Sequence, residues 1–441
     1  MDKGAREALG RRILALAGTG EHEAVVTSGD DGLTRFAHNA IHQNVARSDA
    51  SVQLRTIVDG RSGVAAGNAF DDAGLRDVVE RAAALSALAP RDDVRLAKSP
   101  PASPSTSAFV ASSASASPAE RARDAGEIFG VVEGGGLWAA GYVRATRSGT
   151  TVANSLGTLA SFDATECGVN VKANGDDSTG YAERYVNDFS LLAAREQAAI
   201  AAQKTLASCT PRAVEPGDWT VILEPPAFGE IVAYLTDHFS AQAYDEGSSF
   251  LSDGLGRTVT STNFSLTDDW SNALAPGMPF DYEGTPKERV ALIERGVAKA
   301  FVTDAYWARK LGRQNTGHAL PAPNAAGPQV LDAVVSPGTK TTAQLIAETA
   351  RGLLVSRLWY VRTVDQRRTI VTGMTRDGTF LIENGKIAGG VRNMRFNQSI
   401  LAALGACEMS SERARTGGYS YSMVVPAAKF ERFTFTSTTD F

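Results

Sequence analysis

The stretch from Ser99 to Ala119, SPPASPSTSAFVASSASASPA, is the only strong change of composition in a chain of 441 residues. It holds too few large apolar side chains to order itself by burial, so we expect a linker or an exposed crossing there. A chain of this length accommodates about two or three domains. Outward from this stretch we predict a first region at 1–98, the linker at 99–119, a second region at 120–214 and a third at 215–441.

The two regions beside the linker share one order of predicted elements. Residues 5–17 and 73–88 have the helical spacing of apolar side chains, and alternating segments lie between them. Those segments are bounded by Gly, Asp or Asn, as hairpin strands are, and lie at residues 23–28, 33–45, 51–58 and 62–68. After the linker come a helix from Pro118, strand-like segments between Leu137 and Tyr185, and a helix at about 191–208. We therefore predict an α+β fold in which both regions build one helical layer over a mostly antiparallel sheet.

The third region, residues 215–441, is dense in turn residues. Trp219–Leu223 is predicted to be a strand, Ala227–Thr236 a helix that follows two prolines, and residues 342–353 a second helix. Short strands separated by turns at this density are typical of a closed or sandwich-like β structure. The predicted C-terminal domain is thus β-rich and barrel- or sandwich-like.

Composition excludes several classes of function. The net charge of −5, without a run of basic residues, argues against nucleic-acid binding, which needs Lys and Arg gathered on one face. The cysteines Cys167, Cys209 and Cys407 are odd in number and far apart, so neither a disulfide framework nor a thiolate zinc site is indicated. Because the chain shows neither a signal-peptide pattern nor an apolar stretch that could span a membrane, we expect a cytoplasmic protein.

A histidine pair, His38 and His42, and the single His238 are candidates for chemistry. His38 and His42 are four residues apart, which would place both on one face of a strand at 35–44, but no third metal ligand is identifiable. His238 follows the predicted helix, and Asp245 and Glu246 lie a little further on. These carboxylates could support acid–base chemistry, while a turn with a helix cap is the alternative interpretation.

Other catalytic motifs are missing. Gly378 to Lys386 does not have the spacing of a phosphate-binding P-loop, and Gly254–Gly256 does not have the third glycine of a dinucleotide loop. The GxSxG pattern of serine hydrolases is absent from the sequence. The residues taken alone therefore indicate no self-sufficient active site.

Several ordered motifs resemble the TldD/PmbA (TldE) family. The most specific is FDYEGTP at residues 280–286, followed by LIERGV at 292–297. Further similar stretches, in the family's order, are TRFAHNAIHQ at 34–43, NTGH at 315–318, SPGT at 336–339, QLI at 344–346 and LIENGK at 381–386. The resemblance runs over almost the whole chain and implies the family's fold.

The family has two kinds of subunit, and the resemblance places this chain with one of them. TldD-like subunits carry a zinc-binding HExxxH helix and a late cysteine ligand, whereas TldE/PmbA-like subunits lack these ligands. Anchored on residues 247–252, the HExxxH positions fall on Val232, Ala233 and Asp237. Cysteine is absent from residues 419–423, and Cys407 lies too early to align with the late ligand. Because catalytic zinc takes about three protein ligands, we expect neither metal nor catalysis in this chain alone.

The resemblance thus implies a non-catalytic subunit that pairs with a TldD-like metallopeptidase, in which the zinc is expected. The pair would hold an extended peptide and degrade unfolded peptides or process the leader regions of modified peptides. Peptide or partner contacts are assigned to His238, Thr316, Gly317 and His318. The loop that holds His318 is expected to be exposed, and a plain turn is the alternative interpretation for it. Two other interpretations stay open: a self-associating, homodimeric peptide-binding scaffold without proteolysis, and an independent hydrolase that uses His38/His42 or His238.

Overall fold

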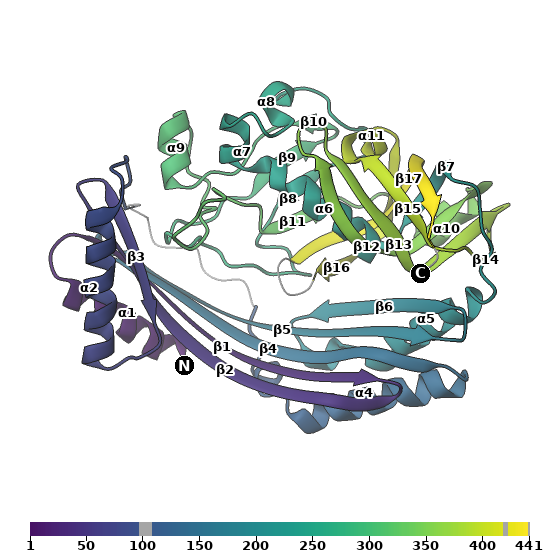
Figure 1. Cartoon of the computed structure of the whole chain (residues 1–441), viewed down its shortest axis with the longest axis horizontal. Helices are drawn as coiled ribbons and strands as arrows, with labels where there is room; N and C mark the ends of the chain where they lie inside the picture. The colour runs from purple at the N-terminus through teal and green to yellow at the C-terminus, as the bar shows by residue number, and fades with distance from the viewer. Residues whose placement is uncertain (97–107, 418–421, 440–441) are drawn as a thin grey trace.

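The computed structural model describes residues 1–96, 108–417 and 422–439. Figure 1 shows a long curved sheet formed by the first half of the chain and a second, β-rich body seated over its inner face. Most of the linker predicted at 99–119 lies outside the described residues. From Ala108 onward the chain is described, and it forms α3 (Ala111–Ala114) before α4 begins at Pro118.

The N-terminal half forms one antiparallel sheet in the strand order β3-β2-β1-β4-β5-β6. The strands are β1 (Glu21–Ala37), β2 (Ala40–Val58), β3 (Arg61–Gly67), β4 (Trp138–Asn154), β5 (Leu159–Asn174) and β6 (Thr179–Val186). The helices are α1 (Lys3–Ala17), α2 (Asp72–Leu88), α4 (Pro118–Gly134), the short η1 (Phe189–Leu191) and α5 (Ala194–Ala207). The regions on the two sides of the linker meet where β1 pairs with β4 along almost its whole length, so both build one sheet, as predicted.

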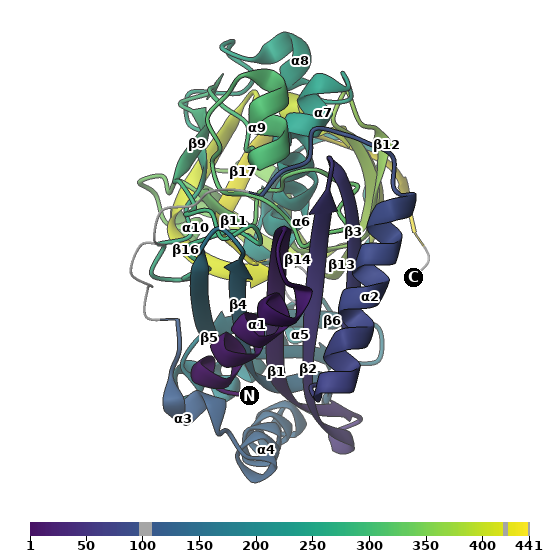
Figure 2. The same ribbon diagram turned by 90° about the vertical axis from the view of Figure 1, so that its left-hand side faces the viewer.

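The helices cover the outer face of this sheet. Helices α1 and α2 pack with β1–β3 around one apolar cluster that includes Ile13, Leu54 and Leu75. Helices α4 and α5 pack with β4–β6 around another that includes Ile128 and Val169. Figure 2 shows α1 and α2 beside each other in front of the strands and α4 below them. The inner face is thereby left to the C-terminal body.

The predicted strand at 33–45 is wrong, because the chain turns in its middle. β1 ends at Ala37 and β2 begins at Ala40. The two residues between them, His38 and Asn39, have φ angles of 50° and 56°, the backbone of a tight hairpin turn. His38 stacks on Trp138 with ring centroids 4.2 Å apart, while His42 is exposed on β2. The two histidines therefore do not share one strand face, and the metal interpretation for them is not supported.

The C-terminal half contains the strands β7 (Gly217–Leu223), β8 (Leu266–Asp268), β9 (Val290–Glu294), β10 (Val297–Ala298), β11 (Asp332–Val335), β12 (Arg351–Asp365), β13 (Ile370–Glu383), β14 (Lys386–Gly390), β15 (Met394–Ser399), β16 (Cys407–Gly417) and β17 (Ser422–Thr438). β7, β12, β13, β15 and β17 form a closed circuit, because β17 pairs with both β15 and β7. The predicted closed β structure is confirmed.

The helices of this half are α6 (Pro225–Thr236), η2 (Asp237–Phe239), α7 (Ala241–Asp245), α8 (Leu251–Gly254), α9 (Ala305–Leu311), α10 (Thr342–Ala347) and α11 (Ile400–Leu404). The helix predicted at 342–353 is wrong in its second half, since β12 begins at Arg351. Gly352 explains the change: a Cβ there would lie 2.7 Å from the Thr220 carbonyl, so β12 approaches β7 closely at this point.

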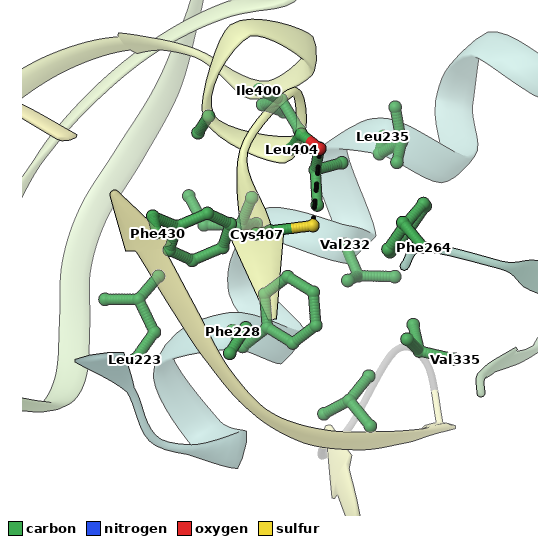
Figure 3. Close-up of a cluster of buried hydrophobic side chains, with 14 of the residues drawn as sticks. Leu223, Phe228, Val232, Leu235, Phe264, Val335, Ile400, Leu404, Cys407 and Phe430 are labelled. Carbon is green, nitrogen blue, oxygen red and sulfur yellow. Dashed lines mark hydrogen bonds between the residues drawn. The ribbon is translucent and has the colours of Figure 1, made fainter. Parts of the chain in front are cut away.

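The largest apolar cluster fills the closed circuit and includes one side of α6. Figure 3 shows Phe228, Val232 and Leu235 of this helix directed at Cys407 and Phe430 of the strands. In the part of the chain that the structure describes, every helix is too short or too polar to cross a membrane.

Candidate functional site

A cleft runs between the inner face of the N-terminal sheet and the C-terminal body. It contains three adjoining cavities. We call them the aromatic cavity (about 500 Å³, with Tyr181, Trp359 and Arg362 in its wall), the helix cavity (about 530 Å³, with Ala233 and Asp237) and the acidic cavity (about 290 Å³, with Glu283 and Asp304). Glu230 lines the first two, and Leu320 lines the second and third. The aromatic and helix cavities therefore follow the exposed side of α6, and the acidic cavity adjoins the helix cavity at Leu320.

Helix α6 divides its residues between core and cleft with a helical period. Phe228, Ile231, Val232 and Leu235 are buried in the apolar cluster. Gly229, Glu230, Ala233 and Tyr234 line the cavities, together with Asp237, the first residue after the helix. The structure therefore brings Ala233 and Asp237 to the cleft but directs Val232, the first of the three predicted zinc-helix positions, away from it.

The HExxxH spacing can also be placed three residues earlier in the chain, and its three positions then all lie on the cleft side. It falls on Gly229, Glu230 and Tyr234, so a glutamate stands at the position of the family's glutamate. A Cβ at Gly229 would lie 2.4 Å from Cγ2 of Thr416, which leaves no room there for an imidazole. The hydroxyl of Tyr234 donates to the Val361 carbonyl at 2.5 Å. In either register, α6 presents at most one carboxylate where catalytic zinc needs about three protein ligands.

The cysteines contribute no ligand near α6's cleft side. Cys407 is buried in the apolar cluster beside Val232, with its sulfur 3.3 Å from the Leu404 carbonyl (Figure 3). Burial raises the pKa of the Cys407 thiol to about 11. Across residues 1–96, 108–417 and 422–439, His, Cys, Asp and Glu side chains form no group of three that could hold a metal ion.

A partly buried carboxyl group lies in the aromatic cavity. Glu183 of β6 accepts hydrogen bonds from the hydroxyls of Tyr181 at 2.5 Å and Thr416 at 2.6 Å. Its burial raises the pKa of this carboxyl above the ordinary value. The hydroxyls of Tyr142 and Tyr185 lie 2.9 Å apart beside it. The alternation of Tyr181, Glu183 and Tyr185 along β6 is the signal by which sequence reasoning could have found this wall.

His238 is not placed for chemistry in the cleft. It is 3% exposed, its ring lies tilted against Phe250, and burial lowers the pKa of His238 to about 4. Asp245 ends α7 and accepts from Lys310 at 2.8 Å, and Glu246 accepts from Gln242. The acid–base interpretation is not supported, because the structure does not bring these carboxylates to His238.

His318 is fully buried, so the exposed loop predicted for it is wrong. Its Nε2 lies 3.2 Å from Asp268 Oδ1, and its Nδ1 lies 3.0 Å from Thr316 Oγ1. This Thr–His–Asp chain has the order of a nucleophile relay, but the Thr316 hydroxyl already donates to the Thr303 carbonyl and accepts from its N–H. Thr316 and His318 line none of the three cavities, and Gly317 approaches the Pro286 carbonyl too closely for a side chain.

The FDYEGTP stretch ties the C-terminal body to the sheet. Asp281 accepts from the backbone N–H groups of Glu283, Thr285 and Ala319. Arg55 of β2 lies between Glu283, at 3.5 Å, and Glu23 of β1, at 3.6 Å. One guanidinium thus serves two buried carboxylates, and burial raises the pKa of Glu23 to about 7. The motif's polar residues are structural.

Comparison with known proteins relates this chain to one family. Residues 216–437 match the PmbA/TldA metallopeptidase C-terminal domain, and residues 23–86 match the PmbA/TldA metallopeptidase domain 1. The chain is 28% identical over 196 residues to a protein named metalloprotease PmbA homolog of Haemophilus influenzae, with 42% of this chain and 39% of that protein aligned. It is 29% identical over 220 residues to metalloprotease PmbA of Escherichia coli O157:H7, with 48% and 46% aligned. The matches thus span less than half the length of these two relatives.

A solved structure resembles the chain over nearly its whole length. The crystal structure of TldE from Thermococcus kodakarensis superposes with a TM-score of 0.88 at 22% identity, covering 98% of this chain and 100% of that one. The fold is that of a metallopeptidase-related protein. The chain belongs to the PmbA/TldD family, and its fold is that of TldE.

Proposed function

We propose that this chain is the non-catalytic, TldE/PmbA-like subunit of a zinc metallopeptidase and that a TldD-like subunit supplies the metal. One observation carries the proposal: the cleft side of α6 holds Gly229, Glu230, Ala233, Tyr234 and Asp237, a set without an imidazole or thiolate. Zinc bound to a TldD-like subunit would activate water for peptide hydrolysis. The residues of this chain would bind and orient the peptide.

The cleft has the dimensions for an extended peptide. α6 has 12 residues and is therefore roughly 18 Å long, which matches about five extended residues. The walls of the cleft combine aromatic rings, carboxylates and backbone groups, and such walls suit a peptide of varied sequence. We therefore assign unfolded peptides, or leader regions of modified peptides, as the substrate class of the complex. Three free cysteines suit a reducing compartment, and we place the complex in the cytoplasm.

The proposal is tested by measuring zinc content and casein or peptide hydrolysis for this chain, for a TldD-like subunit from the same genome, and for their mixture. We expect a 1:1 complex, zinc that enters only with the TldD-like subunit, and hydrolysis by the mixture far above that of this chain. Substitution of the glutamate in the partner's HExxxH helix by glutamine should abolish the hydrolysis.

Two results would overturn the proposal. One zinc per chain with hydrolysis by this chain alone would show an independent enzyme. A homodimer that ignores the TldD-like subunit in light scattering would favour the self-associating scaffold.

A further inference from the structure

The helix cavity, the middle one of the three, combines an apolar wall with acidic side chains. Its apolar part comes from α6 and from the segment that leads to β11, with Ala233, Leu320, Val330 and Leu331. Its two charged residues are both carboxylates, Glu230 and Asp237. Among the lining residues that the structure describes, no lysine, arginine or histidine balances them. The wall of this cavity therefore favours a cation.

Asp237 is the carboxylate of this wall that has no partner. It is exposed to the cavity and forms no hydrogen bond or ion pair within residues 1–96, 108–417 and 422–439. Partial desolvation raises the pKa of the Asp237 carboxyl above its ordinary value, and no cation of the protein offsets this effect. Glu230, by contrast, already interacts with the protein, so we assign no ligand to it.

The position of Asp237 strengthens its preference for a cation. It follows directly after the 12-residue helix α6, at the C-terminal end, where the helix dipole is negative. The last turn of α6 contains no basic residue that could complement this end. A cation bound beside Asp237 would be attracted by the carboxylate and by the dipole together.

The apolar part of the wall fits the stem of a basic side chain. Leu320, Val330 and Leu331 are half-buried and so still offer apolar surface to a ligand. Lysine and arginine pack their aliphatic stems on such surface while their charged heads reach a polar group. Gln329, also in the wall, donates through Nε2 to the Ala326 carbonyl, which leaves its Oε1 as a second acceptor for the charged head.

We infer that the helix cavity binds a lysine or arginine side chain of an extended peptide and that Asp237 selects this side chain. The stem would lie on Leu320, Val330 and Leu331, and the charged head would bond to Asp237 and Gln329. The claim that such a peptide is a substrate rests on the proposed function and deepens it, because it restricts the substrates to peptides with a basic residue. The preference itself is a property of this chain and is measured without a partner.

The test is calorimetric titration of the full-length chain alone with two capped pentapeptides. One is acetyl-Ala-Ala-Lys-Ala-Ala-amide, and the other has norleucine in place of lysine. Norleucine keeps the four-carbon stem without the ammonium group, and the caps remove the charges of the peptide ends. We expect the lysine peptide to bind about tenfold more tightly or better, the usual effect of one charge-assisted hydrogen bond. Added salt should reduce this difference.

Variants assign the preference to one carboxylate. In Asp237→Asn the lysine peptide should bind no more tightly than the norleucine peptide, whereas Asp237→Glu, which keeps the charge, should keep the preference. Asp245→Asn is the matched control, because Asp245 ends the next helix, α7, pairs with Lys310 and lines none of the three cavities. It should bind both peptides like the unaltered chain.

Equal affinity of the unaltered chain for the two peptides, or absence of binding to the lysine peptide, would overturn the inference. A preference for lysine that persists in Asp237→Asn would overturn the role of Asp237. None of these results would affect the proposed pairing with a zinc subunit, which is measured by hydrolysis in the mixture. Conversely, a preference that follows the expected pattern would stand even if the mixture were inactive.

Discussion

Helix α6 has two sides that differ in what they tolerate. The side formed by Phe228, Val232 and Leu235 is packed in the largest apolar cluster of the molecule. The opposite side, with Glu230 and Ala233, faces cavities. The cavities beside it are lined by two carboxylates, Glu230 and Asp237, and by no imidazole or thiolate of the helix. The side that packs in the core and the side that lines the cavities are therefore opposite sides of one helix, and each can be substituted separately.

The largest effect is expected from placing one histidine on each side. Val232→His loses a buried apolar side chain and buries an imidazole without a partner, which we expect to cost about 3–5 kcal/mol of unfolding free energy. Ala233→His directs the same ring into the helix cavity and should cost less than about 1 kcal/mol. Urea unfolding followed by circular dichroism measures both. Equal costs for the two neighbours would show that α6 does not have two distinct sides.

The neighbours Asp237 and His238 extend the comparison to pH. Burial lowers the pKa of His238 to about 4, whereas in the unfolded chain the pKa of this histidine is near its ordinary value of 6.5. Between these values the unfolded state is protonated and the folded state is not, so stability falls as the pH decreases from about 6.5 to 4. The loss is at most on the order of 3 kcal/mol and is absent above pH 6.5.

The measurement is urea unfolding of the unaltered chain and of His238→Gln at several pH values across this window. As the pH falls, the unaltered chain should lose stability relative to His238→Gln, because glutamine does not titrate. A difference that stays constant from pH 7 to pH 4.5 would contradict the buried, neutral histidine.

Local pattern was enough to predict α6 but not the lengths of the N-terminal strands. Apolar side chains recur at helical spacing from Ala227 to Leu235, and the helix follows them. In β1, by contrast, Gly29 and Gly32 with the aspartates between them resemble a turn, yet the strand continues because β2 and β4 pair with it on both sides. Pairing partners from distant sequence overrule the local preference.

The third expected effect concerns the space at Gly229. Alanine favours a helix over glycine by about 1 kcal/mol, but its Cβ would overlap Cγ2 of Thr416. Gly229→Ala should therefore lower the unfolding free energy by about 2 kcal/mol. Thr416→Ser removes Cγ2 and keeps the hydroxyl that donates a hydrogen bond to Glu183. In this background, Gly229→Ala should be neutral or stabilising. Thermal unfolding of the four proteins gives the coupling, and an equal cost in both backgrounds would rule out Thr416 as the obstacle.

The candidate site was predictable only in part, for a related reason. The family resemblance located α6, but its side-chain directions depend on which side the closed β circuit covers. The aromatic cavity takes residues from β4, β5, β6, α6, β12 and β16, which are spread over more than half of the chain. His318 was expected to be exposed because its loop is polar, yet Asp268 pairs with it in the interior. Burial of a polar loop residue depends on such a distant partner.

The smallest effect is expected at Tyr234, on the cleft side. Its hydroxyl donates to the Val361 carbonyl, which also accepts from Arg362 at 2.6 Å. Tyr234→Phe removes one donor and leaves the carbonyl with the other, so we expect a loss of only about 0.5–1 kcal/mol in urea unfolding. A loss above about 3 kcal/mol would mean that the cleft side contributes to stability as the core side does, since a hydroxyl at a cavity wall would then be as costly to remove as a buried apolar group.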